Sequence, residues 1–263
     1  MIKKIFTTAY SSAESEIKTQ SKPDYKVILI CITVAFSLTM IKYLGDFTFM
    51  LSFLRNIGLN TLSADFENYC TINKNAELYR LIYWVSTVIF FYLIPPFLLI
   101  KFVFKEKFSA YGLSMKGAFA DYKIYVLMLC VMIPLVLFFS RTESFQARYP
   151  FYNIAKGESF YPNLLIWELL YFIQFFALEF FFRGFMLHGT KHRFGFYSVF
   201  VMTIPYCMIH FGKPLPETIA AIIAGIVLGT LSLKSKSIWL GVAIHYSVAI
   251  TMDVCSMWQK GIF

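Results

Sequence analysis

Long apolar segments constrain this chain more than any other feature of its sequence. Several runs of hydrophobic residues recur along it, and each is close to the ~20 residues that a helix needs to cross ~30 Å of hydrocarbon. Hydrophobic residues make up 58% of the 263 positions and charged residues only 15%. A soluble domain of this size needs a more polar surface than that. The sequence therefore predicts an all-α fold, a polytopic helical bundle in a membrane.

Seven transmembrane helices are predicted from these runs. They cover about 27–44, 81–103, 124–140, from Pro162 to beyond Arg183, 196–211, 216–233 and 238–257. The segment 45–79, between the first two, is partly amphipathic, and we expect it to rest at the membrane interface.

The charged residues suggest an orientation and a partner. If the seven spans cross the membrane in alternating directions, most Lys and Arg residues lie on the same side as the N-terminus. Because Lys and Arg are enriched in cytoplasmic loops, this predicts a cytoplasmic N-terminus. The first 25 residues lack an apolar core, so we expect no cleavable signal peptide.

The net charge of +9 is spread over the loops. This spread favours anionic lipid headgroups of the bilayer, and not nucleic acid, as the partner. The five cysteines form no CxxC pair and indicate neither a disulfide framework nor a thiolate zinc site.

One apolar segment carries an unexpected pair of charges. Glu179 and Arg183 lie four residues apart, on one helix face, among Leu and Phe residues. Each charge costs at least ~2.5 kcal/mol to insert at the centre of a membrane helix. A simple ion pair is one explanation. A functional site is the other explanation, because Glu168 lies on nearly the same stripe of the helix, three turns earlier, and adds a third ionisable group.

Two histidines extend this candidate site. His210 and His245 occur in later apolar helices, and Asp253 follows His245 by eight residues. Counting residues from the predicted turns places Glu179 and His210 at similar depths, with His245 and Asp253 in the same broad layer. Glu with two His suits a divalent metal such as zinc, held by Glu179, His210 and His245. It equally suits a metal-free acid–base site, in which Glu and His activate water and a second His stabilises the oxyanion. The sequence leaves the cofactor open.

These residues resemble the motifs of the CAAX-protease and bacteriocin-processing family of intramembrane proteases, also called CPBP or Abi. That family shows Glu-Glu-x-x-x-Arg, Phe-x-x-x-His and His-x-x-x-Asn or Asp in successive helices. Here the motifs read Leu178-Glu179-x-x-x-Arg183, Tyr206-x-x-x-His210 and His245-x-x-x-Ala249.

The family includes type II CAAX prenyl endopeptidases. The resemblance therefore implies an intramembrane endopeptidase that hydrolyses a peptide bond with a Glu/His-activated water. The substrate would be a membrane-associated or C-terminally tagged peptide or protein. Residues 105–263 would form the protease core. Residues 1–104 would hold the cytoplasmic tail, two transmembrane helices and the interfacial segment. We expect an integral protein of the bacterial inner (plasma) membrane. The catalytic candidates are Glu179, Arg183, His210, His245 and Asp253.

Two motif positions depart from the family pattern. Leu178 replaces the first Glu, which is usually regarded as the water activator, and Ala249 replaces the closing Asn or Asp. If the protein is active, another carboxylate must act. We rank Glu179 first, Asp253 second and Glu168 third. Two alternatives stay open, a catalytically inactive relative that binds membrane peptides and a small proton-coupled transporter.

Overall fold

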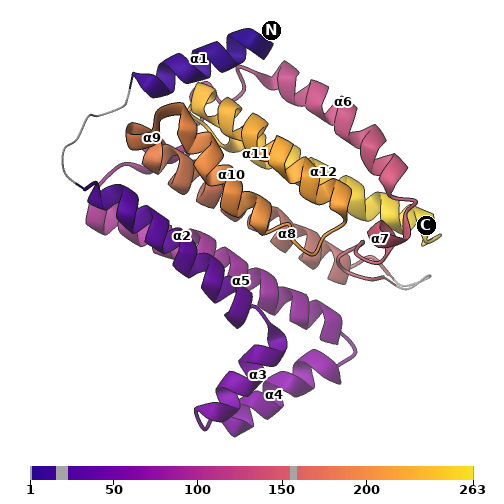
Figure 1. Ribbon diagram of the computed structural model, residues 1–263. Coiled ribbons are helices and arrows are strands. Elements are labelled where there is room, and N and C mark those ends of the chain that lie inside the picture. The colour runs from indigo at the N-terminus through magenta and orange to yellow at the C-terminus, as the bar shows by residue number, and fades with distance from the viewer. Residues whose placement is uncertain (1, 16–22, 155–158, 263) are drawn as a thin grey trace.

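The chain folds into a bundle of helices (Figure 1), described by a computed structural model for residues 2–15, 23–154 and 159–262. This part of the chain contains helices and no strand, which confirms the predicted all-α class. The long helices are α2 (Tyr25–Leu44), α5 (Ala76–Leu98), α6 (Tyr122–Phe139), α8 (Asn163–Glu179), α11 (Leu215–Ser235) and α12 (Trp239–Gln259). The shorter α-helices are α1 (Ile2–Glu14), α3 (Phe47–Asn56), α4 (Asn60–Thr71), α7 (Glu143–Gln146), α9 (Gly189–Phe194) and α10 (Ser198–Met208).

Two π-helical and two 3₁₀ segments complete the helices of the described residues. The π-helices are η1 (Leu99–Phe104) and η3 (Phe180–His188), and the 3₁₀ turns are η2 (Phe108–Tyr111) and η4 (Gly195–Tyr197). Helices α3 and α4 form a hairpin that projects from the bundle, at the end where α2 ends and α5 begins (Figure 1). This hairpin occupies the segment that we expected at the membrane interface.

Six helical runs within the described residues, and not seven, are long and apolar enough to cross a membrane. The prediction of seven was wrong because the predicted fifth span is not a separate long helix. It is the short end of one helical run, Asn163–Met208, of 46 residues. Its last helix, α10, has only 11 residues.

That 46-residue run turns back on itself. A straight helix of this length would extend roughly 70 Å, about twice the hydrocarbon thickness. The chain reverses at Gly195, whose φ of 54° favours glycine. Helix α10 then packs back against η3, as Figure 1 shows.

The π-helix η3 lies at the centre of the bundle. Its residues Phe180, Phe181, Phe182 and Phe185 are fully buried. The Phe181 ring stacks on Tyr92 of α5 at 4.5 Å between centroids. These large apolar side chains explain why the charged Glu179–Arg183 segment is held in the interior. The same packing fixes the position of the charges.

Candidate active site

Glu179 and Arg183 form an ion pair in the interior of the bundle. Glu179 is the last residue of α8, and Arg183 lies one turn later in η3. Arg183 Nη1 donates to Glu179 Oε1 at 3.0 Å, and both residues are 0% exposed. The four-residue spacing brings the two side chains together along one helix face. The pair balances two charges that would each be costly alone.

His245, which lies on α12, contacts the same carboxylate oxygen. Its Nδ1 lies 2.9 Å from Glu179 Oε1. A carboxylate only accepts hydrogen bonds, so this contact places the imidazole proton on Nδ1. Nε2 of His245 then carries a lone pair. The His245 side chain is 16% exposed, whereas the Glu179 side chain is 1% exposed. The imidazole is therefore more accessible to water than the carboxylate.

Tyr206 of α10 connects Arg183 with both histidines. The Arg183 guanidinium lies over the Tyr206 ring, 3.8 Å from its centroid, in a cation–π contact. The same ring lies 4.9 Å from the His210 ring and 6.2 Å from the His245 ring, centroid to centroid. Tyr206 is therefore the shared wall of the site.

His210 lies in the turn just after α10, and not within a helix as predicted, and it is held by the backbone of α10. Its Nδ1 donates to the Tyr206 carbonyl oxygen at 2.9 Å, since a carbonyl can only accept. Nε2 of neutral His210 thus carries a lone pair, as it does in His245. Both imidazoles have one nitrogen fixed by an acceptor, an arrangement that sets the tautomer and the ring orientation.

A glycine gives Glu179 its place against α12. A Cβ atom added at Gly241 would lie 2.7 Å from Glu179 Oε2, closer than real Cβ contacts allow. Gly241 lies one turn before His245 on α12, so the absent side chain lets this helix approach the carboxylate. Within the described residues, Oε2 of Glu179 and the Nε and Nη2 atoms of Arg183 are buried without a hydrogen-bond partner. Such groups mark a polar site with unused hydrogen-bonding capacity.

The other candidate carboxylates make contacts of their own. Asp253 is buried on α12, where its Oδ1 accepts from the backbone N–H of Phe151 at 3.2 Å. The carboxylate of Glu168 accepts from the Tyr246 hydroxyl at 3.2 Å. Neither carboxylate hydrogen-bonds to the Glu179, Arg183 or His245 side chain in the part of the chain that the structure describes. Asp253 lies eight residues beyond His245, ~12 Å along the helix axis.

Glu217 is a further carboxylate of the chain, and its contacts are structural. It accepts from the Tyr149 hydroxyl at 2.7 Å and pairs with Lys213 at 2.6 Å, near the start of α11. These contacts tie the loop before α8 to α11.

The two departing motif positions are both apolar and buried. Leu178 is 6% exposed and belongs to the central cluster around η3. Ala249 packs in a second cluster with Trp167 and Tyr171. No side chain at either position offers a proton acceptor, so any acid–base chemistry falls to neighbouring residues.

A metal does not fit this donor set well. Across residues 2–15, 23–154 and 159–262, no three His, Cys, Asp or Glu side chains gather closely enough to hold an ion. Glu179 Oε1, one of the expected ligand atoms, is already shared by Arg183 and His245. We therefore derive no step through a metal.

Comparison with known families agrees with the resemblance drawn from the motifs. Residues 160–251 match the family of Type II CAAX prenyl endopeptidase Rce1-like proteins. The Rce1-like match runs from just before α8 into α12 and includes Glu179, Arg183, His210 and His245. Asp253 lies outside it. No curated protein and no solved structure matches the chain.

The Rce1-like match confirms the recognition made from the sequence and supports protease activity in general. Together with the six apolar helices, it makes the chain an integral membrane protein.

Sequence reasoning missed two residues of the site. Tyr206 was read only as a motif position, although its aromatic ring one turn before His210 was a usable signal. Gly241 received no role. A small residue one turn before a buried histidine is the pattern that permits close helix approach, and it could have pointed to this contact.

Proposed function

We propose that this protein is an intramembrane endopeptidase of the CPBP/Abi type that hydrolyses a peptide bond of a membrane-associated or C-terminally tagged substrate. The observation that supports it best is the chain of contacts from Arg183 through Glu179 Oε1 to His245 Nδ1, at 3.0 and 2.9 Å. A carboxylate behind an imidazole orients the ring and stabilises the imidazolium that forms during proton transfer.

In the proposed reaction, Nε2 of His245 is the general base. A water oxygen attacks the scissile carbonyl carbon while one water proton passes to this nitrogen. The carbonyl oxygen becomes an oxyanion, and the imidazolium is stabilised by Glu179. The carbon–nitrogen bond then breaks, and the proton on Nε2 passes to the leaving amine. The products are one new carboxyl group and one new amine.

His210 acts on the same water in this proposal. Its Nε2 lone pair accepts the second water hydrogen and so fixes the direction of attack. If His210 is protonated, Nε2–H instead donates to the oxyanion. Arg183 and Tyr206 are positioning residues, because they hold the carboxylate and the imidazoles without reaching the substrate in this scheme.

Glu179 takes the place of the carboxylate lost at Leu178, with a changed role. It orients His245 and is not itself the proton acceptor in this proposal, because Oε1 already receives two hydrogen bonds and Oε2 is buried against Gly241. Asp253 and Glu168 rank below it because each is engaged elsewhere.

The test is cleavage of co-reconstituted peptides by the full-length protein in liposomes. The panel holds prenylated and unprenylated peptides with C-terminal cysteine motifs, and single-span membrane peptides. We expect Glu179→Gln and His245→Gln to abolish cleavage at normal protein levels. Asp253→Asn and Glu168→Gln are matched controls that remove a carboxylate charge from the same helices, and both should retain cleavage. Loss of cleavage in a control alone would reassign the acid.

A second function is favoured by one observation. Leu178 and Ala249 fill two motif positions with buried apolar side chains, which fits a relative that binds membrane peptides without cutting them. Binding of panel peptides by the parent protein, with no cleavage of any of them, would support this function and contradict the proposed hydrolysis.

A further inference from the structure

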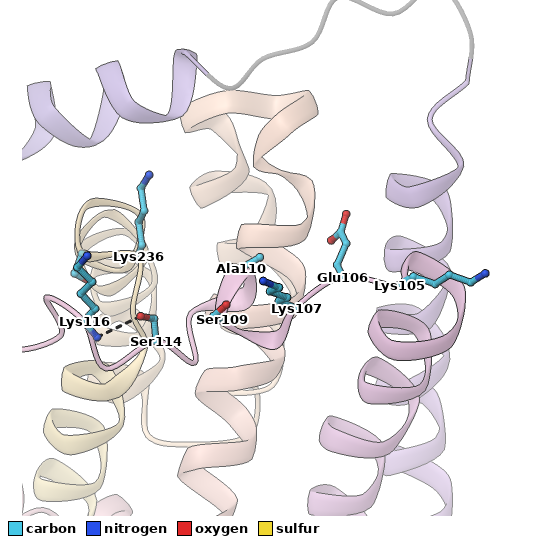
Figure 2. A pocket seen from close by; sticks show the side chains of 9 residues that line it. Lys105, Glu106, Lys107, Ser109, Ala110, Ser114, Lys116 and Lys236 are labelled. Carbon is cyan, nitrogen blue, oxygen red and sulfur yellow. Dashed lines mark hydrogen bonds between the residues drawn. The ribbon is translucent and has the colours of Figure 1, made fainter.

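An open groove lies at the end of the bundle where α5–η1 and α11 end (Figure 2). It has a volume of about 750 Å³ and is lined by nine residues from two segments, 105–116 and 235–236. Four lysines line it: Lys105, Lys107, Lys116 and Lys236. Three serines and Glu106 add hydroxyl and carboxylate groups. The groove is distant in sequence from the candidate active site and is not used by the proposed hydrolysis.

The two segments that form the groove are fixed to each other. The backbone N–H of Ile238 donates to the carbonyl of Gly112 at 3.0 Å. Gly112 has a φ of 81°, and a Cβ atom there would lie 2.7 Å from the Ile238 side chain. Glycine is therefore required at this contact. The lysines of both segments are held on one preformed frame.

Two of the lysines have an uncommon backbone conformation. Lys105 and Lys236 have φ values of 53° and 54°, and no other non-glycine residue that the structure describes has a positive φ. Each lysine forms the left-handed C-cap that ends its helix, a conformation that residues other than glycine adopt infrequently. Each of these lysines directly follows a membrane-spanning helix, after Phe104 and Ser235 respectively. Both therefore lie at the depth where a span meets the headgroup layer.

The charge of the groove is positive. Its one carboxylate, Glu106, is held by Lys26 Nζ at 2.7 Å and by the Tyr111 hydroxyl at 2.6 Å. Burial opposes ionisation, but these hydrogen bonds outweigh it and lower the pKa of Glu106, so its charge is matched by Lys26. Among the described residues, Lys105, Lys107 and Lys116 form no salt bridge. Figure 2 shows Lys107 and Lys116 spaced along the loop, with Lys236 on the side of Lys116 and Lys105 pointing away.

We propose that this groove binds the phosphodiester headgroup of an anionic membrane lipid. Basic pockets between transmembrane helices recognise such headgroups through lysine ammonium groups. Serine hydroxyls can donate further hydrogen bonds to phosphate oxygens. The position of the groove beside two span ends fits a ligand that is anchored in the bilayer and presents its phosphate at the interface.

The test compares two double variants of the full-length protein in neutral detergent. Lys107→Gln/Lys116→Gln removes two groove charges. Lys101→Gln/Lys123→Gln removes two charges from the same end of the bundle but outside the groove. Binding of short-chain phosphatidylglycerol, phosphatidylcholine and inorganic phosphate is measured by titration. The unfolding temperature without lipid checks that each variant is folded.

We expect the parent to bind phosphatidylglycerol, the groove variant to bind it about tenfold or more weakly, and the control to stay within about twofold. Equal losses in both variants would show a diffuse surface charge effect and overturn the proposal. Equal binding of phosphatidylcholine would also overturn it. Inorganic phosphate binding as tightly as phosphatidylglycerol would identify a free-phosphate site and reject the lipid as the ligand.

Discussion

Gly241 gives Glu179 its position, because a Cβ atom at Gly241 would lie 2.7 Å from Glu179 Oε2. The carboxylate that pairs with Arg183 and His245 thus lies directly against the backbone of α12. Glu179 forms an ion pair on one side and lies against the backbone of α12 on the other, where Gly241 has no side chain.

Gly241→Ala should lower the cleavage rate at least tenfold. The added methyl group pushes Glu179 away from His245 Nδ1, and a misplacement of about 1 Å can cost about 10²-fold in rate. Alanine favours a helix over glycine by ~1 kcal/mol, so a loss of activity cannot come from weaker helix formation. Cleavage assays and thermal unfolding would be compared with Ala243→Val, a larger enlargement of a side chain at an exposed position of α12. Unchanged cleavage by Gly241→Ala would contradict this role of the glycine.

Arg183→Leu should destabilise the protein by about 3–5 kcal/mol, because it leaves the buried Glu179 charge without its strongest partner. The double variant Glu179→Leu/Arg183→Leu removes both charges and should regain much of that stability while remaining inactive. Denaturant or thermal unfolding in a defined detergent measures the difference. If Arg183→Leu unfolds like the parent and cleaves normally, the ion pair has neither role.

Tyr206→Phe should keep cleavage within about twofold, whereas Tyr206→Leu should lose much of it. The phenylalanine ring preserves the face on which the Arg183 guanidinium lies at 3.8 Å. Leucine removes a desolvated cation–π contact worth about 2 kcal/mol. Cleavage rates and unfolding temperatures of the two variants separate the ring from the hydroxyl. Equal losses in both would assign the role to the hydroxyl.

Treatment with a chelator should leave cleavage unchanged. Glu179 Oε1 is shared by Arg183 and His245, and no group of three ligating side chains gathers in the described residues. Cleavage is measured after dialysis against a chelator and again after zinc is added. Loss of activity that zinc restores would show a metal site and contradict the acid–base scheme.

Several features of this protein followed from the sequence alone. The length of an apolar run indicates whether a helix can cross the membrane, so the all-α bundle and most span positions were predictable. The Glu179–Arg183 contact was also predictable, because residues four apart on one helix meet whatever the rest of the chain does. The motif spacing was sufficient to predict the resemblance that the Rce1-like match over residues 160–251 confirms.

Tertiary structure decided the rest. The count of six spans depends on the length of α10, which has only 11 residues, and an apolar run in the sequence does not show where a helix within it ends. The contact between Glu179 and His245 joins residues 66 positions apart. Its register depends on how α12 packs against α8, and on the absence of a side chain at Gly241. The same reason applies to the lysine groove, whose two segments are distant in sequence. Helix propensity and hydrophobicity act locally, whereas sites of this kind are set by which helices pack together and at what depth.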